Sequence, residues 1–244
     1  MAYGGPPPDV SSGASEILRE EQRPLYRDVP DVEVVLSGNR RVRLSTLWSD
    51  RPLLITMFYR RCAGSCGLFL SSLRSVVNDV GGLGDDYRIV TLSFEPADTV
   101  DSLVDYARAL GIPDDGRWMF GMATPADTDR IAGAIGFWYR RQAATDQYDH
   151  PTLVAAVRRG KIVRVLLGST VARSRFREVA AELHGRFIPF YARPGERTLF
   201  RCLRVSGATQ DVRMDWGVLI LFLPGGAAVT IAALVFRRGR ETAP

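Results

Sequence analysis

The sequence predicts an α/β layered domain followed by a transmembrane helix, and three observations lead to this prediction. Short apolar runs typical of strands alternate with segments of helical periodicity between residues 53 and 184. Cys62 and Cys66 lie where the first of these runs passes into a helical segment. An uncharged run, residues 217–236, follows near the C-terminus. A cysteine pair at the first strand-to-helix junction narrows the domain to a thioredoxin-like architecture.

The first 30 residues differ in composition from the rest of the chain. They contain a Gly-Gly pair, three consecutive prolines, a short serine- and glycine-rich stretch and a charged run, without a periodic apolar face. We therefore expect residues 1–30 to form a flexible segment. The predicted domain, residues 31–185, begins with a β-hairpin over residues 32–44, because two apolar-rich runs flank a Ser-Gly-Asn turn.

Two strand–helix units follow the hairpin. Residues 53–58 form a continuous apolar run, which is typical of a strand buried on both faces. Apolar residues then recur at helical spacing until a pair of glycines ends the helix. Residues 87–94 predict a second central strand. The next helix is capped by Asp98 or Thr99 and runs to about residue 110, where a glycine and a proline close it.

The rest of the domain continues this alternation and closes with a hairpin and a helix. The run Thr-Leu-Val-Ala-Ala-Val turns at Arg-Arg-Gly into a second apolar run, which is the pattern of a hairpin. We expect short strands at residues 118–120 and 137–139, helices at 125–135 and 170–184, and the closing hairpin at 152–157 and 162–167.

The C-terminal part predicts a membrane anchor. We assign residues 186–215 to a linker with a short strand near residues 199–205, residues 216–237 to a transmembrane helix and residues 238–244 to a short basic tail. A helix of about 20 residues spans about 30 Å, which matches the hydrocarbon core of a bilayer. The arginines that follow it favour a cytoplasmic C-terminus. The domain would then face the periplasm or the cell surface.

The predicted membrane anchor has one competing interpretation, and it conflicts with one feature of the N-terminal sequence. The uncharged run contains a Pro-Gly-Gly sequence, which membrane helices tolerate, but a buried helix of a soluble protein is the competing interpretation. An extracytoplasmic domain also requires an export signal, and residues 1–30 contain no apolar run of the kind found in signal peptides. We expect that the natural start lies upstream of residue 1 or that a signal has been removed, and the alternative is a domain that stays in the cytoplasm.

The charge distribution argues against nucleic-acid binding. The net charge is +5, and Lys161 is the only lysine among 32 basic residues. The arginines are scattered and do not form a basic face interleaved with aromatic residues, as nucleic-acid recognition would favour. The 3 cysteines of the chain do not make a disulfide framework, so their count does not reveal the redox compartment.

Cys62 and Cys66 are the residues best suited to chemistry. If the helix begins near Cys62, the two side chains lie on one face, one turn apart, with roughly 6 Å between Cβ atoms. That spacing suits two sulfurs bound to one soft metal ion, and it lies within reach of a disulfide. A helix N-terminus would favour the thiolate of Cys62. The alternative to a chemical role is that the two cysteines are simply small buried residues on an amphipathic helix.

His150 is the candidate third ligand. It lies in a polar loop that enters a predicted strand, and in a thioredoxin-like layout this loop faces the start of the first helix. Two thiolates and one imidazole favour copper, Cu(I) or Cu(II), by ligand softness. A structural zinc site needs a fourth protein ligand, which Cys202 could supply only if the linker folds back. His184 is better explained by the helix end at which it lies. We also expect a cis peptide bond before Pro151.

These motifs resemble those of the SCO/SenC family over roughly residues 28–185. The resemblance rests on Cys62-xxx-Cys66 after a strand, on the segments Ser-Phe-Glu-Pro-Ala-Asp-Thr and Gly-Phe-Trp-Tyr, and on Tyr-Asp-His-Pro around His150. It implies a thioredoxin-like fold and copper bound by Cys62, Cys66 and His150. It also implies a role in assembling the copper centre of cytochrome c oxidase, with subunit II of that oxidase or another copper-receiving protein as the partner.

The chain departs from the family pattern at three places. Gly67 stands where well-known members have proline, and Glu95 stands where aspartate is usual. Cys202 is followed by Leu-Arg-Val in place of an aromatic-rich segment. The three implied copper ligands are retained.

The leading expectation is a membrane-anchored copper chaperone. The alternative is a thiol–disulfide reductase that acts on the cysteines of a copper-receiving protein, with Cys62 as the attacking thiolate. This second activity needs both cysteines but not His150. A third interpretation is a membrane-tethered scaffold whose cysteines form an inert disulfide. A peroxidase is disfavoured, because Glu95 and Asp98 form no carboxylate pair with a visible general acid and Asp98 is better explained as a helix cap.

Overall fold

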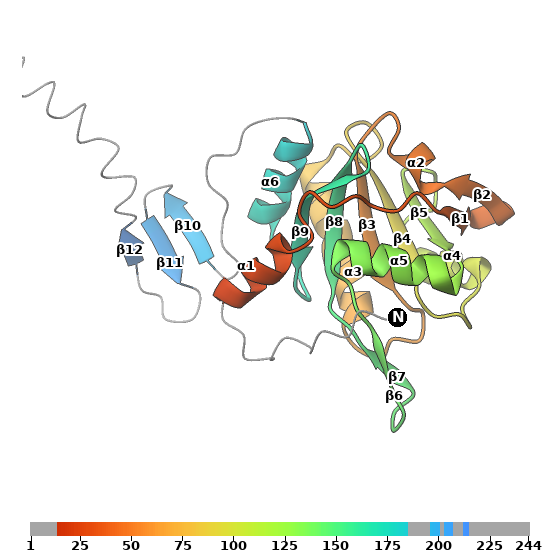
Figure 1. Cartoon of the computed structure of the whole chain (residues 1–244). Helices are drawn as coiled ribbons and strands as arrows, with labels where there is room; N and C mark the ends of the chain where they lie inside the picture. The colour runs from red at the N-terminus through yellow and green to blue at the C-terminus, as the bar shows by residue number, and fades with distance from the viewer. Residues whose placement is uncertain (1–13, 185–195, 201–202, 207–211, 215–244) are drawn as a thin grey trace, which may run out of the picture. The chain divides into compact units, whose positions relative to one another are not determined.

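The computed structural model describes residues 14–184, 196–200, 203–206 and 212–214. The chain divides into two compact units, one ending at Tyr191 and one beginning at Ala192. The elements of the first unit (Figure 1) are α1 (Ala14–Gln22), β1 (Glu33–Leu36), the 3-10 turn η1 (Ser37–Asn39), β2 (Arg40–Arg43), α2 (Leu44–Leu47), β3 (Leu53–Phe58), α3 (Ser65–Val80), β4 (Arg88–Ser93), α4 (Val100–Ala109), β5 (Trp118–Met122), α5 (Pro125–Ile135), β6 (Arg140–Gln142), β7 (Gln147–Asp149), β8 (Leu153–Arg158), β9 (Lys161–Leu167) and α6 (Arg173–Leu183). The described elements of the second unit are β10 (Glu196–Phe200), β11 (Leu203–Ser206) and β12 (Val212–Met214).

Seven strands of the first unit form one mixed sheet in the order β2-β1-β5-β4-β3-β8-β9. The strands β3, β4 and β5 are mutually parallel, and the outer strands pair antiparallel. Parallel neighbours need a crossover connection, which α3 and α4 provide. Figure 1 shows α5 across the near side of the sheet and α3 behind it, and α6 packs against α3. This is the α/β layered, thioredoxin-like architecture that the sequence predicts.

The central strands are apolar because both of their faces are covered. All six residues of β3 are buried, as are the first five of β8. The polar groups among them are paired: Thr56 Oγ1 donates a hydrogen bond of 2.7 Å to the Leu153 carbonyl oxygen. Trp118 Nε1 likewise donates to Thr91 Oγ1 at 2.9 Å. These bonds offset the cost of burying polar atoms. The apolar run at residues 53–58 correctly predicted the buried strand β3.

The pairing of β3 with β8 decides which loops meet. The two strands are antiparallel neighbours, with Leu53 opposite Val157 and Thr56 opposite Val154. The carboxyl end of β3 therefore lies beside the amino end of β8. The segment after β3 carries the two cysteines, and the residue that precedes β8 by three positions is His150. The sheet thus brings both to the same edge.

A capping box starts α4. The Oγ1 of Thr99 accepts a hydrogen bond from Ser102 N at 3.3 Å, and Ser102 Oγ accepts one from Thr99 N at 3.2 Å. These bonds satisfy two backbone donors that the helix leaves without an internal partner. Of the two cap candidates from the sequence, Thr99 is the cap, and Asp98 has another role.

Residues 14–30 are structured, and the expectation of a flexible segment was wrong for them. The helix α1 packs against β9, and the carboxylate of Glu21 is buried there. Glu21 accepts a hydrogen bond from Leu167 N at 2.8 Å and forms an ion pair with Arg175. Val29 N donates to the Gly160 carbonyl oxygen at 2.8 Å. The contact depends on a charged residue satisfied by distant partners, which a search for apolar periodicity does not detect.

Two further expectations are corrected. Residues 137–139 are not a strand: the extended pairing begins at Arg140, and the ring of Phe137 is buried instead. The linker predicted at residues 186–215 contains the three-stranded antiparallel sheet β10-β11-β12 in its described part. Strands this short give little periodic signal in the sequence.

The predicted membrane helix lies outside the described residues. Within the part of the chain that the structure describes, no helix combines the length and apolarity needed to cross a membrane. Residues 216–237 and the basic tail at 238–244 both fall beyond that part.

We expect Thr99→Ala to lower the free energy of unfolding by about 1 kcal/mol, because α4 loses the acceptor for the Ser102 N–H. Urea unfolding followed by circular dichroism measures the loss. Thr99→Ser keeps the hydroxyl and should unfold close to the wild type. An equal loss in both variants would mean that the threonine methyl group, rather than the cap, supplies the stability.

Candidate metal centre

The two cysteines lie on either side of the start of α3. This helix begins at Ser65, so Cys66 is in its first turn and Cys62 is in the preceding loop. The expected helix start near Cys62 was wrong, because Gly64 has φ −122° and ψ −112°, outside the helical region. Cys66 is buried and Cys62 is half-buried, and neither is in a disulfide.

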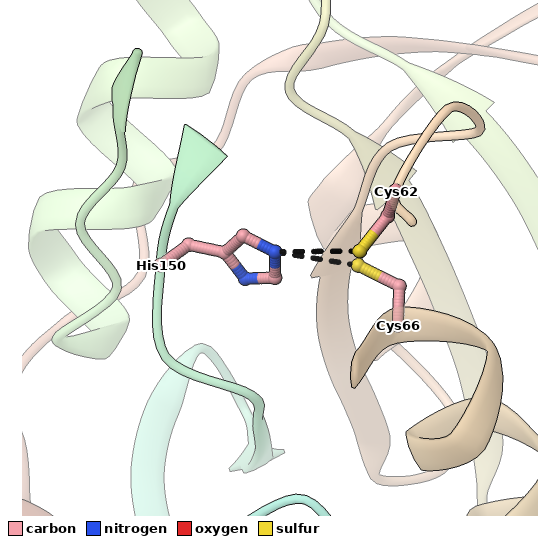
Figure 2. A group of neighbouring side chains, drawn as sticks. All are labelled: Cys62, Cys66 and His150. Carbon is pink, nitrogen blue, oxygen red and sulfur yellow. Dashed lines mark hydrogen bonds between the residues drawn. The ribbon is translucent and has the colours of Figure 1, made fainter. Parts of the chain in front are cut away.

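His150 lies between β7 and β8 and points at both sulfurs (Figure 2). Its Nε2 is 3.4 Å from the Sγ of Cys66 and 3.9 Å from the Sγ of Cys62. All three ligand atoms lie within 4.8 Å of one another, and no other His, Cys, Asp or Glu group in the described part of the chain is so placed. The fold therefore brings together the three residues that the sequence singled out.

A carbonyl oxygen determines which nitrogen of His150 carries the proton. The Nδ1 atom lies 2.9 Å from the carbonyl oxygen of Pro151. Because a carbonyl oxygen can only accept, Nδ1 donates, and the Nε2 of the neutral ring presents its lone pair to the sulfurs. Metal-binding histidines are commonly oriented in this way.

The expected cis peptide before Pro151 is wrong. No cis peptide bond occurs among the described residues. The chain passes from His150 into β8 without a turn, so the backbone has no need of the reversal for which a cis proline is typically used.

Aromatic rings enclose the imidazole. The ring centroids of Tyr59, Phe94 and Phe137 lie 5.7, 5.4 and 5.8 Å from that of His150. Tyr148 packs edge-on against both Tyr59 and Phe94. This packing restricts rotation of the imidazole and keeps its surroundings apolar. Phe94 and Phe137 belong to segments that the sequence marked as family-like, but their contact with His150 could not be read from it.

Hydrogen bonds join the cysteine loop to the strand before His150. The Oε1 of Gln147 accepts from Tyr59 Oη at 2.8 Å and from Ala63 N at 3.1 Å. Tyr59 Oη in turn accepts from Tyr148 N at 3.2 Å. Burial raises the pKa of Tyr59 to about 12, so its hydroxyl stays protonated at neutral pH and can donate. Sequence reasoning missed Gln147, because a glutamine in a short polar strand belongs to no motif.

Asp98 holds the other part of the cysteine loop. Its buried carboxylate accepts from Arg60 N at 3.0 Å and from Ser93 Oγ at 2.6 Å. The interpretation of Asp98 as a helix cap was wrong, because the next residue caps α4 and leaves this carboxylate free to bind the loop. Glu95, also buried, accepts from Ala97 N at 3.1 Å. Both acids therefore support the backbone around the site.

The two thiols differ in acidity. The hydrogen bond from the Cys66 thiol holds the pKa of Cys62 well below its ordinary value, against the opposing effect of burial. The same contact with Cys62, together with burial, raises the pKa of Cys66. In the reduced, metal-free protein Cys62 is therefore the thiolate at neutral pH and Cys66 keeps its proton. The expected thiolate is correct, although its main cause is the neighbouring thiol and not the helix N-terminus.

The spacing of the three groups fits a single metal ion. With bonds of about 2.3 Å to sulfur and about 2.0 Å to nitrogen, a trigonal site places sulfur and nitrogen about 3.7 Å apart. The observed 3.4 and 3.9 Å bracket this value. Two sulfurs and one imidazole match Cu(I) and other soft or borderline ions better than Mg²⁺ or Ca²⁺. The described residues provide no fourth ligand to complete a structural zinc site.

Gly67 allows close packing beside Cys66. A Cβ atom at this position would lie 3.0 Å from the Oη of Tyr106. The ring of Tyr106 stacks on Phe58 at the end of β3, with centroids 5.6 Å apart. Glycine therefore lets Tyr106 fill the space between β3 and the first turn of α3, which gives a structural reason for the departure from proline at this position.

The remaining candidate ligands are not part of this group. His184 is the C-cap residue of α6, and its Nε2 lies 3.0 Å from Asp86 Oδ2. This agrees with the expected structural role at a helix end. Cys202 lies outside the described residues.

Comparisons with known proteins are consistent with this geometry. The family model described as SCO1/SenC matches residues 39–184. A search of curated proteins gave no significant match. Among solved structures, a candidate electron transfer protein from Aquifex aeolicus VF5 is 25% identical with a TM-score of 0.61, and the match covers 66% of this chain and 95% of that chain.

Two other solved structures resemble the domain at lower identity and show its fold. Bradyrhizobium japonicum ScoI, solved with copper bound, is 19% identical with a TM-score of 0.53, covering 66% of this chain and 99% of that one. BsSco is 17% identical with a TM-score of 0.56, covering 67% and 95%. BsSco is described as a member of the Sco family of cytochrome c oxidase assembly proteins with a disulfide switch.

We expect iodoacetamide to modify Cys62 before Cys66 in the reduced, metal-free protein. Because its pKa is lowered, Cys62 is a thiolate throughout the range from pH 6 to 8, and its rate of reaction with iodoacetamide should change little there. The reaction rate of an ordinary thiol rises about tenfold per pH unit over the same range. Fragment-ion mass spectrometry separates the two sites, and Cys66 should react only after unfolding. A Cys62 rate that rises tenfold per pH unit would contradict the assignment.

Proposed function

The chain belongs to the SCO1/SenC family, and we propose that it is a copper chaperone that binds copper through Cys62, Cys66 and His150. The observation that carries the proposal is the meeting of two thiol sulfurs with a histidine Nε2 at 3.4 and 3.9 Å. Two sulfurs and one imidazole suit Cu(I) and can also hold Cu(II). The copper is cargo in this proposal, not a permanent cofactor.

The ligand set suits release as well as binding. Three protein ligands leave one coordination position open, and Cys62 is half-buried at the site. A ligand of a receiving protein could therefore enter before the chain's own ligands leave. We propose cytochrome c oxidase subunit II, or another copper-receiving protein, as the partner. The family membership and the description of BsSco as an oxidase assembly protein support this partner.

We further propose that residues 216–237 anchor the domain to a membrane, with the domain outside the cytoplasm and the C-terminus inside. The uncharged run at residues 217–236 has the length of a membrane helix, and arginines follow it. A tether of this kind would keep the copper site close to a membrane-bound oxidase.

A second function is thiol–disulfide exchange, and the unequal thiols favour it. The Cys62 thiolate would attack a partner's disulfide and form a mixed disulfide, releasing one partner thiolate. Cys66 would then lose its proton and attack the Cys62 sulfur. The partner gains two electrons and leaves as a dithiol, and the chain retains a Cys62–Cys66 disulfide. This reaction needs no histidine ligand.

We expect the reduced chain to bind about one copper, and His150→Ala to weaken Cu(I) binding at least about tenfold. Loss of groups that merely orient a ligand already costs about 10- to 100-fold, so loss of a ligand should cost no less. Competition against a Cu(I) chelator measures the affinity. His184→Ala removes the other histidine of the chain and should leave the affinity unchanged. Wild-type affinity in His150→Ala would remove histidine from the mechanism.

The same variants separate the two functions in cells. Lost oxidase maturation with His150→Ala supports copper handling, whereas normal maturation with His150→Ala and loss with Cys62→Ser supports thiol exchange. Normal maturation with both Cys62→Ser and Cys66→Ser would instead support an inert scaffold.

The full chain should remain with membranes after an alkaline carbonate wash if residues 216–237 span the bilayer. Val229→Arg places a charge near the middle of the span, at a cost of about 3 kcal/mol on an insertion scale. This variant should shift a measurable fraction of the chain to the supernatant, while Val229→Ala should not. A wild-type chain that the wash releases completely would exclude a transmembrane anchor.

A further inference from the structure

The hairpin that leads to His150 forms a sheet separate from the central one, although Tyr148 packs against Tyr59 and Phe94. Strands β6 and β7 form a two-stranded sheet of their own, and Figure 1 shows it projecting from the central sheet. All three residues of β6 are exposed. An isolated two-stranded hairpin is marginally stable in water at best. The position of His150 relative to the cysteines therefore depends on what ties β7 to the cysteine loop.

Two kinds of polar contact make that connection. Arg61 of the cysteine loop lies 3.8 Å from Asp146 of the hairpin, but both side chains are about half exposed, and such ion pairs contribute roughly 0 to 1 kcal/mol. Gln147 instead accepts two hydrogen bonds from the cysteine loop, from Tyr59 Oη at 2.8 Å and from Ala63 N at 3.1 Å. Tyr59 is buried and also accepts from Tyr148 N at 3.2 Å.

The two hydrogen bonds that Gln147 accepts lie next to the metal site. Ala63 directly follows Cys62, and Gln147 is three residues before His150. A single amide oxygen thus receives one donor from the backbone beside a ligand and one from the ring that packs against the imidazole. The contacts join segments about 84 residues apart in the chain. These hydrogen bonds therefore help to set the distance between the cysteine sulfurs and the histidine nitrogen.

We infer that Gln147 is a positioning residue for the metal site, which holds His150 at the two cysteines through Tyr59 and the backbone of Ala63. This inference rests on the proposed function, because it concerns the copper affinity that His150 contributes. The role requires only an acceptor oxygen at position 147. A side chain of similar size without that oxygen should loosen the histidine and leave both cysteines in place.

The experiment measures Cu(I) affinity of the reduced full chain by chelator competition. Gln147→Leu should weaken binding about 10- to 100-fold, the range typical when a group that orients a metal ligand is lost. Gln147→Glu keeps an acceptor oxygen and should restore binding to within a few fold of the wild type. Tyr59→Phe removes only the hydroxyl and should give an intermediate loss. Gln142→Leu is the matched control, because that amide bonds to Asp149 within the hairpin.

A double-mutant cycle with His150→Ala identifies the route of the effect. If Gln147 acts through His150, Gln147→Leu should cost almost nothing further once His150→Ala is present. Additive losses in the cycle, wild-type affinity in Gln147→Leu, or an equal loss in Gln142→Leu would each overturn the inference. Wild-type affinity in His150→Ala itself would instead overturn the proposed copper site, and the inference with it. Thermal unfolding of each variant shows that the chains compared are folded.

Discussion

Strands β3 and β8 are antiparallel neighbours in the seven-stranded sheet, so the end of one lies beside the start of the other. The remaining features of the site depend on this pairing. It brings the segment that carries the cysteines to the edge at which the chain enters β8 from His150. Burial of both strands on both faces makes the register costly to change, since a shift by one residue would turn every side chain to the opposite face. The two strands that carry the site are therefore almost entirely buried.

The two sulfurs have different environments although they lie close together. Cys66 is held in the first turn of α3 and is buried, whereas Cys62 lies in a loop and is half-buried. The contact between them lowers the pKa of one and raises the pKa of the other. One thiolate beside one protonated thiol suits attack on a disulfide, and deprotonation of both suits a soft metal. The same pair thus supports both proposed activities, and His150 is the group that distinguishes them.

The two sides of the site are supported in different ways. The cysteine loop follows a buried strand, leads into a helix and is bonded to the buried Asp98. The imidazole is attached through aromatic contacts, the Pro151 carbonyl oxygen and the Gln147 bonds, at the base of an exposed hairpin. The cysteine side is thus held by a strand, a helix and a buried carboxylate, and the histidine side mainly by side-chain contacts. The departure at Gly67 adds to the packing of the cysteine side, because it admits Tyr106 beside the helix.

The sequence by itself determined the central strands, most helices and the three residues of the site. Continuous apolar runs and helical spacing are local patterns that burial imposes directly, and the chain has so few soft ligands that Cys62, Cys66 and His150 stand out. Only the tertiary structure decided that α3 begins after Cys62, that α1 is anchored by a buried Glu21, and that Asp98 and Gln147 bind the cysteine loop. The bonds that Asp98 and Gln147 make to the cysteine loop join residues 38 and 84 positions apart. A hydrogen bond between distant segments leaves no periodicity in either one, so the folded chain alone reveals it.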